Sequence, residues 1–490
     1  MANPNQEIKY TKLFINNEFV DAVSRKTFAV NNPANERKVA DVSEADKADV
    51  DLAVKAADKA FARGSQWRNT NPSARADLLN KLATLVDRDS DYIANLTVLE
   101  NGKSFFMAKG ENYRFSQILR FYAGIVDKYY GKTIPVDGNF FTYTRKEPIG
   151  VVGAILPWNA PVIMLAFKWA PALAAGCTIV TKPAEQTPLA ALYIAALSKE
   201  AGFPDGVINV VNGFGPTAGA AIVSHLRVRK VAFTGSTDVG KIIMKNAADS
   251  NLKKVSLELG GKSPLVIFDD VDLDEAVPLA QDAIFVNHGQ VCCAGSRTFV
   301  QEGIYDEFVK RSVELAKKRK VGNPFAPDTV QGPQIDEESL NKILTYVNYG
   351  KADGAKLEIG GNRIGTEGYF VEPTVFSNVT DEMRIAKDEI FGPVQCIIKF
   401  KTIEEVIERA NRTNYGLAAG VLTKNIDTAF AFVNAVEAGS VWVNCYNASF
   451  INAPFGGYKE SGIGRELGEE GLNLYLETKT VSVKLAKNKL

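Results

Sequence analysis

The sequence predicts an α/β protein with a parallel, doubly wound sheet. From Gly150 onward, short apolar runs alternate with helical stretches, and a second series of the same kind starts at Pro264. This alternation is typical of parallel strands joined by helices that cover both faces of a sheet. The chain has 490 residues, which is long for one domain, so we expect two or three domains.

The expected elements follow one another in a βαβαβ order. The N-terminal part is helical and amphipathic at 46–63 and 73–86. The first series has expected strands at 151–156, 177–181, 207–211, 230–233 and 254–259, and helices at 161–175, 188–201, 216–225 and 237–248. The second series has expected strands at 264–268, 297–301, within 391–400 and at 439–444, and helices at 273–286, before about 320 and at 403–413.

Two further strands are expected outside both series. Residues 139–147 have the composition of a strand, and residues 478–484 alternate in polarity like an exposed one. An exposed strand near the chain end presents unpaired backbone groups. A second subunit is a natural partner for it.

The composition argues against several function classes. Lys plus Arg (57) balance Asp plus Glu (57), which leaves no electrostatic footprint for nucleic acid or an anionic membrane. Two histidines leave little room for a His-rich metal site or a Ser-His-Asp triad, so the base of an enzyme should be a carboxylate. The five cysteines show no disulfide or zinc spacing, which favours a reducing, cytoplasmic compartment.

One uncharged stretch, 149–167, has the length of a membrane span. Pro157, Asn159 and Pro161 interrupt it, which favours a buried strand, a turn and a buried helix instead. The first ten residues are polar and lack a signal-peptide pattern.

Two glycine patterns follow expected strands and suggest nucleotide binding. The segment 235–242 (GSTDVGKI) nearly matches a phosphate-binding P-loop, but Ile242 replaces the Ser or Thr that binds magnesium, which argues against an ATP-binding module. Ser236 stands at an expected helix N-terminus. A phosphate-binding site and a plain turn capped by the serine are about equally expected there. The pattern 213–218, with Gly215 as its second glycine, fits G-x-G-x-x-A and is weakly specific.

Two acidic positions follow expected strands. Lys182 and Glu185 come after 177–181, at the end of a strand where open α/β sheets bind ligands. A carboxylate there can accept hydrogen bonds from the two hydroxyl groups of a ribose. The plain alternative is an acidic residue at a helix N-terminus, which is common. Glu258 lies between leucines at a strand end, where desolvation should raise its pKa and suit a general base. An ordinary strand-end acid in water is the plain alternative.

Two polar loop residues could carry chemistry. Cys292 lies among small residues, where close backbone N–H groups can make a reactive thiolate. A buried structural thiol is the plain alternative, and it is the expectation for Cys293 and the other three cysteines. Asn159 directly follows a strand, where its amide can donate to a developing oxyanion or simply shape a turn.

Taken together, these motifs resemble those of the aldehyde dehydrogenase superfamily, in its order and spacing. The similarity is greatest to the class that oxidises general aldehydes and retinal. The matching segments are 157–159 (PWN), 182–185 (KPAE), 233–236 (FTGS), 257–264 (LELGGKSP), 289–292 (GQVC), 389–393 (EIFGP), 414–417 (NYGL), 454–457 (PFGG) and 461–466 (SGIGRE).

The resemblance implies NAD-dependent oxidation of an aldehyde to a carboxylic acid. A thiohemiacetal and then a thioester would form on the cysteine, and water activated by the base would release the acid, with no metal needed. The roles implied are Cys292 as nucleophile, Glu258 as base and Asn159 as oxyanion donor, with Lys182 and Glu185 on the adenosine ribose, Ser236 and Trp158 at the pyrophosphate, Gly215 in the cofactor site, Glu389 on the nicotinamide ribose and Phe391 near the nicotinamide.

The resemblance also implies the architecture and a homotetramer built from dimers. A Rossmann-like cofactor domain would comprise 1–125 and 149–259, and an α/β catalytic domain 260–446. A small β oligomerisation layer would comprise 126–148 and 467–490. The segment 447–466 would return to the cofactor domain.

Several positions depart from the family pattern and bear on the substrate. Ala160 stands where an aromatic residue often walls the substrate tunnel, Val291 replaces a frequent cysteine, and 449–451 (SFI) is an unusual stretch. The alternative function is that of a lens-crystallin-like structural protein on the same fold. Loss of Cys292, Glu258 or Asn159 would mark that function, and all three are present.

Overall fold

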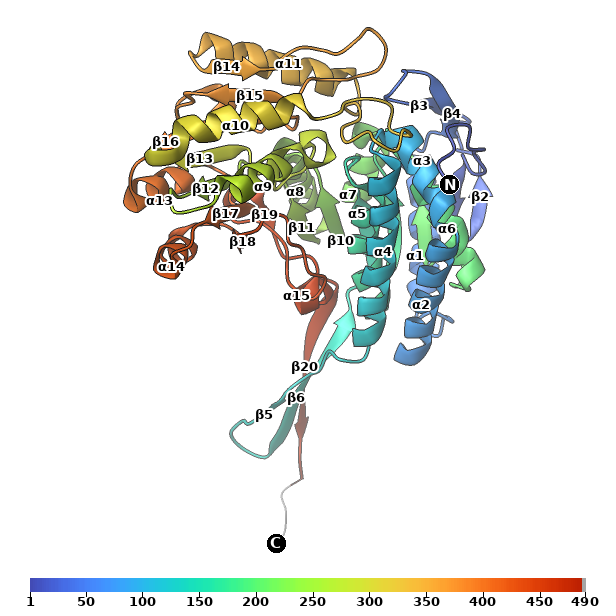
Figure 1. The fold of residues 1–490 in the computed structure, drawn as a ribbon. Helices are drawn as coiled ribbons and strands as arrows, with labels where there is room; N and C mark the ends of the chain where they lie inside the picture. Colours follow the sequence, from blue (N-terminus) through green and yellow to red (C-terminus); the bar gives the residue numbers. More distant parts are fainter. Residues whose placement is uncertain (487–490) are drawn as a thin grey trace.

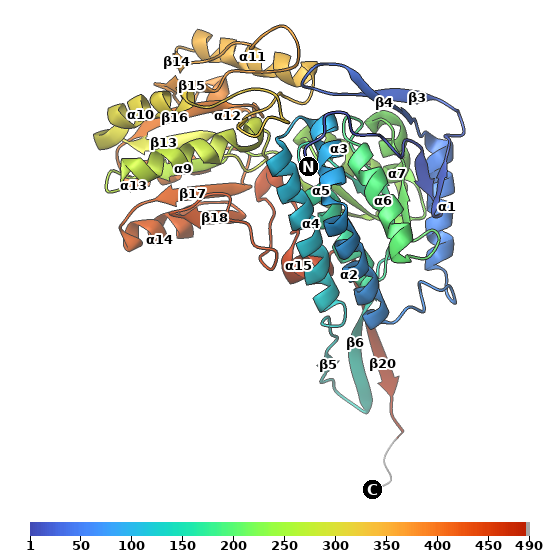
Figure 2. The same ribbon diagram turned by 45° about the vertical axis from the view of Figure 1, so that its right-hand side comes forward.

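The computed structural model describes residues 1–486. The chain forms two large sheets with helices on both faces, and a thin arm of strands projects from this body (Figure 1). The turned view separates the two layered halves and shows α4 (Phe105–Ile125) and α5 (Pro161–Ala175) near their boundary (Figure 2). The α/β class and both predicted series are therefore confirmed.

The first sheet has the strand order β19-β11-β10-β7-β8-β9-β1-β2. β7 has β8 on one side and β10 on the other, and all three are parallel, so the strand order reverses beside β7. Ligands of doubly wound sheets bind at the carboxyl ends next to such a point. The strands are β1 (Leu13–Ile15), β2 (Glu18–Val20), β7 (Val151–Ile155), β8 (Thr178–Lys182), β9 (Ile208–Val210), β10 (Val228–Thr234), β11 (Lys254–Glu258) and β19 (Gly462–Ile463).

Apolar residues on both faces of β7 explain why helices cover both sides. Val152 and Ala154 belong to the core under α5 (Pro161–Ala175) and α6 (Leu189–Ala201). Val151 and Ile155 belong to the core under α1 (Lys47–Phe61) and α8 (Thr237–Asn251). Side chains alternate across a strand, and a parallel strand buried on both faces is apolar throughout.

The helix expected at 216–225 is shorter than predicted. A π-helical turn (Gly215–Gly219) comes first, and α7 (Ala220–Ser224) follows it. The two glycines lower the helix propensity of this segment, which accounts for the difference.

The second sheet has the order β14-β15-β16-β13-β12-β17-β18, and only β14 runs antiparallel to its neighbour. Helices α9 and α10 pack on one face, and α11, α13 and α14 on the other. The elements are β12 (Pro264–Ile267), α9 (Leu273–Phe285), β13 (Arg297–Gln301), α10 (Tyr305–Lys317), α11 (Glu337–Ala352), β14 (Lys356–Ile359), β15 (Thr374–Ser377), β16 (Val394–Phe400), α13 (Ile403–Asn411), β17 (Ala418–Leu422), α14 (Ile426–Ala435) and β18 (Ser440–Val443).

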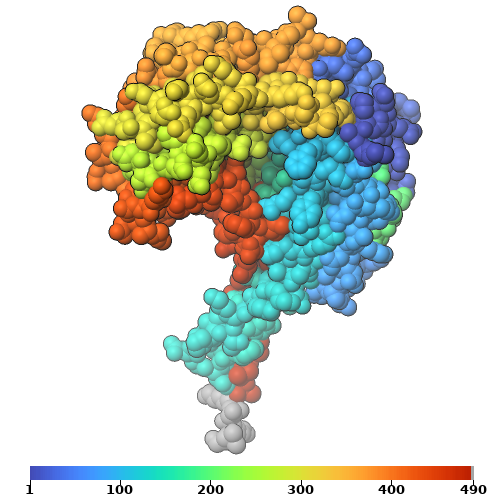
Figure 3. Space-filling model, viewed as in Figure 1, coloured from blue at the N-terminus to red at the C-terminus, as the bar shows by residue number. Residues whose placement is uncertain are grey.

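The arm consists of β5 (Thr133–Ile134), β6 (Phe140–Pro148) and β20 (Leu476–Lys484). It projects below the body in the space-filling view (Figure 3). β20 pairs with β6 along its whole length, so its partner on one edge lies in the same chain. Among the described residues, its other edge has no partner strand.

The remaining elements complete the body. α2 packs against α4, and α4 packs against α5. No helix in the described range 1–486 has both the length and the apolar character needed to cross a membrane. These elements are β3 (Thr27–Asn31), β4 (Lys38–Ser43), α2 (Pro72–Arg88), α3 (Ser90–Asn101), α4 (Phe105–Ile125), α12 (Arg384–Lys387) and α15 (Gly468–Asn473).

Candidate active site

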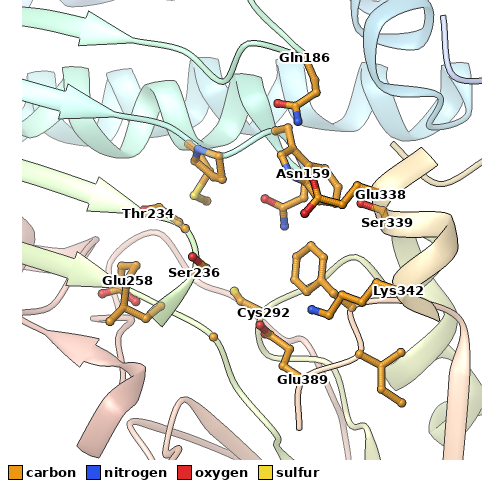
Figure 4. A pocket seen from close by; sticks show the side chains of 18 of the residues that line it. Asn159, Gln186, Thr234, Ser236, Glu258, Cys292, Glu338, Ser339, Lys342 and Glu389 are labelled. Carbon is orange, nitrogen blue, oxygen red and sulfur yellow. The ribbon is translucent and has the colours of Figure 1, made fainter. Parts of the chain in front are cut away.

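A cavity of about 320 Å³ opens at the carboxyl ends of β7, β10 and β11, beside the point where the strand order reverses. Seven of the ten predicted site residues line it, and Figure 4 shows several of their side chains. These seven are Trp158, Asn159, Ser236, Glu258, Cys292, Glu389 and Phe391.

A strained turn positions the loop that carries Cys292. Asn287, His288 and Gly289 follow α9 with φ values of 49°, 61° and 75°. A Cβ on Gly289 would lie 2.0 Å from the carbonyl oxygen of Gly392, so only glycine fits there. Left-handed conformations of the two other residues cost about 1–3 kcal/mol each and persist only where the surroundings impose them.

His288 is the buried anchor of this turn. Its Nδ1 lies 2.9 Å from the carbonyl oxygen of Pro333, and its Nε2 accepts the backbone N–H of Gly332 at 2.9 Å. These partners fix the neutral ring with its proton on Nδ1. Burial lowers the pKa of His288 to about 3.

Asn159 is held on both its backbone and its side chain. Its Nδ2 donates to the carbonyl oxygen of Gln290 at 2.9 Å, and its own carbonyl accepts from Lys103 Nζ at 2.9 Å. Lys103 in turn forms a buried ion pair with Glu111 of α4. An amide nitrogen carries two hydrogens, so the second Asn159 N–H remains for a ligand in the cavity.

The two adjacent cysteines have different surroundings. Cys292 lines the cavity, whereas Cys293 is buried and its thiol donates to Asn447 Oδ1 at 3.4 Å. A hydrogen bond with Cys293, burial and the carboxylate of Glu258 raise the pKa of Cys292 well above its usual range.

The surroundings of Cys292 therefore favour its neutral thiol over the thiolate. The sequence left both a reactive thiolate and a buried thiol open, and in this structure a neighbouring thiol, burial and nearby carboxylates shift the pKa of Cys292 upward. The thiol consequently needs a base to become a nucleophile.

Glu258, the last residue of β11, has the properties of such a base. It is buried, and its Oε2 has no hydrogen-bond partner among the described residues. Burial and the nearby carboxylate of Glu466 raise the pKa of Glu258 well above its usual range, as the sequence predicted. Gly456 closes one side, where a Cβ would lie 2.7 Å from Glu258 Oε1.

Glu389 is a buried carboxylate of a different kind. Its Oε1 accepts the backbone N–H of Gly261 at 3.0 Å. Burial raises the pKa of Glu389. A Cβ on Gly260 would lie 2.6 Å from Glu389 Oε2, so a glycine is needed for this close approach. The hydrogen bond fixes the carboxylate at the cavity wall, which suits a binding group.

Two aromatic rings and a helix start complete the predicted wall. Phe391, at φ 61°, meets Trp158 edge-on with ring centroids 5.3 Å apart. Ser236 caps α8, its hydroxyl accepting from the Val239 N–H at 3.4 Å, and also lines the cavity. The capped turn and the potential anion site predicted at Ser236 are thus the same feature.

The other three predicted residues, Lys182, Glu185 and Gly215, lie outside the cavity lining. Lys182, at the end of β8, donates to Glu185 Oε2 at 3.1 Å and to the carbonyl of Gly213 at 2.8 Å. Burial lowers the pKa of Lys182. A Cβ on Gly215 would meet nothing within 4 Å, so the backbone of this turn is open to a ligand.

Several lining residues escaped the sequence reasoning. Gln186 follows β8, and a group at the start of α11 faces the cavity from the second sheet (Figure 4). Asp336 caps α11 through the N–H of Ser339 at 2.8 Å, an ordinary helix start with no chemical signature. The lining residues of this group are Asp336, Glu338, Ser339 and Lys342.

Comparisons with known proteins agree with this geometry. The model of the aldehyde dehydrogenase family matches residues 19–481. The chain is 59% identical to aldehyde dehydrogenase 1A1 of Gallus gallus, over 98% of this chain and 94% of the relative. It is 59% identical to retinal dehydrogenase 2 of Homo sapiens, over 98% and 93%. The NAD+ complex of aldehyde dehydrogenase from Bacillus cereus superposes with a TM-score of 0.96 at 50% identity, covering 98% of this chain and 97% of that one.

Proposed function

The chain belongs to the aldehyde dehydrogenase family and oxidises aldehydes to carboxylic acids with NAD, and we propose that Cys292 is its nucleophile, Glu258 its base and Asn159 its oxyanion donor. One observation carries this assignment: all three line the same cavity, each with a group left free for chemistry. Glu258 Oε2 lacks a partner, Asn159 has a second N–H, and the Cys292 thiol reaches the cavity.

The residues at the carboxyl edge of the first sheet fit NAD. Lys182 and Glu185 would hold the adenosine ribose at the end of β8, beside the open turn at Gly215. The N-terminus of α8 at Ser236 suits a pyrophosphate. When bound, NAD supplies the hydride acceptor. The remaining assignments are Trp158 at the pyrophosphate, Glu389 at the nicotinamide ribose and Phe391 near the nicotinamide.

The acylation step begins with removal of a proton from Cys292. Because the pKa of the thiol is raised, the carboxylate of Glu258 is the group that takes this proton. The sulfur then bonds to the aldehyde carbon, and the carbonyl oxygen becomes an oxyanion. The free N–H of Asn159 and the backbone N–H of Cys292 stabilise that charge. Departure of a hydride with its electron pair from this carbon leaves a thioester on Cys292.

Hydrolysis of the thioester requires a base a second time. Glu258 first releases the Cys292 proton to solvent, and its carboxylate then takes a proton from a water molecule whose oxygen bonds to the thioester carbon. The carbon–sulfur bond then breaks, the carboxylic acid leaves, and the sulfur regains a proton. A buried carboxylate with a raised pKa suits both proton transfers near neutral pH.

The arm supports a proposal about assembly. The free edge of β20 and the exposed faces of β6 would pair with a second subunit, and the family pattern favours a homotetramer in the cytoplasm. All five cysteines are free, which suits a reducing compartment. Light scattering at micromolar concentration should give the mass of four chains, and a monomeric mass would contradict the proposal.

Replacing each of the two adjacent cysteines by serine, one at a time, tests the mechanism. Cys292→Ser should abolish NADH formation from a simple aldehyde while NADH binding, followed by fluorescence, persists. Cys293→Ser should retain most of the activity, because the Cys293 thiol is buried and donates its hydrogen to Asn447. Equal losses from the two substitutions would refute the assignment of the nucleophile.

A further inference from the structure

An arginine of α4 has a charge that no carboxylate of the described chain neutralises. Arg114 is half-buried, and its Nη2 donates to the carbonyl oxygen of Ser449 at 2.9 Å and to Ser449 Oγ at 3.2 Å. Within residues 1–486, its other three N–H groups donate to no protein acceptor, and it forms no ion pair. A guanidinium presents five donors in a planar fork that matches a carboxylate.

The position of Arg114 on α4 ties it to the active site. It lies one helical turn after Glu111, and residues three apart occupy the same side of a helix. Glu111 pairs with Lys103, whose ammonium group donates to the Asn159 carbonyl at 2.9 Å. Arg114 is therefore next to the support of the oxyanion donor.

The residue that Arg114 contacts belongs to a loop that also contacts Cys293. Ser449 comes two residues after Asn447, which accepts the Cys293 thiol at 3.4 Å. In the space-filling view, the red C-terminal part of the chain lies beside cyan residues of the region that contains α4 (Figure 3), and the Arg114–Ser449 bonds are part of this contact. Arg114 thus joins α4 to the loop that borders the nucleophile.

Apolar side chains belong to, or pack beside, the loop that Arg114 contacts. Phe455 of this loop packs against the same small cluster as Cys292 and also against the core that includes α5. Ile163, on the first turn of α5, and Ile451 are half-buried against that core. Ala160, the residue directly before α5, carries no aromatic ring. The thiol of Cys292, these apolar side chains and the cation of Arg114 are therefore connected through one loop.

We propose that Arg114 binds the distal carboxylate of the substrate, so that the preferred substrates are aldehydes with an apolar chain ending in a carboxylate. The inference rests on the proposed function, because it takes Cys292 as the site of the aldehyde carbon. The free N–H groups of Arg114 receive the carboxylate, while its bonds to Ser449 hold the guanidinium in place.

Matched substrates test this directly. The kcat/KM values of ω-oxo carboxylic acids are compared with those of neutral n-alkanals of the same carbon number. The intact enzyme should prefer the oxo acid by about ten- to a hundred-fold at its best chain length, the range of a hydrogen-bonded charge pair. The preference should shrink as salt concentration rises. No preference at any chain length would overturn the inference.

Variants separate recognition from support of the loop. Arg114→Gln should reduce the ratio of the two kcat/KM values toward one, and Arg114→Lys should retain part of it. The control Arg120→Gln removes another half-buried arginine of α4, one that pairs with Asp87, and it should leave the ratio of the two kcat/KM values unchanged. If Arg114→Gln lowers both values equally, Arg114 only supports the loop and the inference is wrong. If neither substrate class yields NADH, the proposed function itself is refuted, and the inference with it.

Discussion

The two ends of the predicted cofactor and substrate site are held in different ways. At the catalytic end, the Asn159 carbonyl accepts a hydrogen bond from Lys103, which pairs with Glu111 in a buried ion pair. The hydrogen bonds of His288 anchor the turn that leads to Cys292. At the end of β8, Lys182 holds Glu185, whose side chain is a third exposed. The first region is buried and over-determined, whereas the second is in contact with water.

We infer from this difference that the buried end determines the chemical steps and the exposed end determines which cofactor binds. Burial raises the pKa of Glu258 and lowers that of His288, and a hydrogen bond with Cys293 raises that of Cys292. A substitution there should therefore change the reaction or the stability of the fold. Near Glu185, water screens charges and few bonds depend on the side chain. A substitution there should change which cofactor binds and leave the chemical steps alone.

The largest expected effect comes from Glu258→Gln. Glutamine keeps the shape but cannot take a proton, so steady-state turnover should fall by about a hundred- to ten-thousand-fold. Rapid mixing should still show one burst of NADH, and the burst should become faster as pH rises, because hydroxide then deprotonates the Cys292 thiol in place of Glu258. Normal steady turnover would remove Glu258 from the mechanism.

Glu389→Gln is the matched control for that experiment. It makes the same change in a second buried carboxylate of the cavity, one that already accepts the Gly261 N–H. We expect weaker NAD binding and a slower burst, without accumulation of the thioester. Accumulation of a thioester in this variant as well would show that the two carboxylates do not have separate roles.

An intermediate effect concerns acid stability at the catalytic end. The pKa of His288 is about 3 in the folded chain, against an ordinary 6.5. Below pH 6.5 the unfolded chain binds a proton that the folded chain excludes, so stability falls by about 1.4 kcal/mol per pH unit toward pH 3. Between pH 6.5 and pH 5 the loss should approach about 2 kcal/mol.

Melting temperatures at neutral and acidic pH measure this contribution. His288→Asn tolerates the left-handed backbone and does not titrate, so its melting temperature should fall less on acidification than that of the unmodified protein. His225→Asn, at the half-buried second histidine, should fall nearly as much as the unmodified protein. An identical fall in His288→Asn and the unmodified protein would show that His288 does not set the acid sensitivity.

Sequence reasoning succeeded where structure is local. Apolar runs predicted the parallel strands of both series, and strand ends predicted the positions of Glu258 and Asn159. It failed between 321 and 390, where α11 and β14–β15 are short or have mixed polarity and their pattern is weak. The cavity residues contributed by α11 were therefore missed.

Long-range contacts were also beyond the sequence. Lys103 and Asn159 are 56 residues apart, and no local pattern signals that one supports the other. The raised pKa of Cys292 depends on the fold that brings Glu258 and Cys293 to the same thiol. One long-range contact was predicted in part. The sequence indicated that β20 is an exposed strand that needs a partner, and the structure pairs one edge of β20 with β6 of the same chain.

The smallest expected effect tests the exposed end. Glu185 stands beside Lys182 at the end of β8, where the 2′-hydroxyl of an adenosine ribose would bind. A 2′-phosphate would meet the carboxylate as a like charge, so the unmodified enzyme should have a higher kcat/KM for NAD than for NADP. Glu185→Ser removes the charge and leaves Lys182 available, which should narrow the ratio of kcat/KM for NAD to kcat/KM for NADP by about tenfold, or about 1.4 kcal/mol.

The rate of the NADH burst at saturating NAD should stay close to that of the unmodified enzyme, because Cys292 and Glu258 keep their surroundings. Steady-state rates with each cofactor, at two salt concentrations, measure both quantities. A large fall in the burst rate would show that the two ends are coupled, and an unmodified enzyme that prefers NADP would refute the role of Glu185.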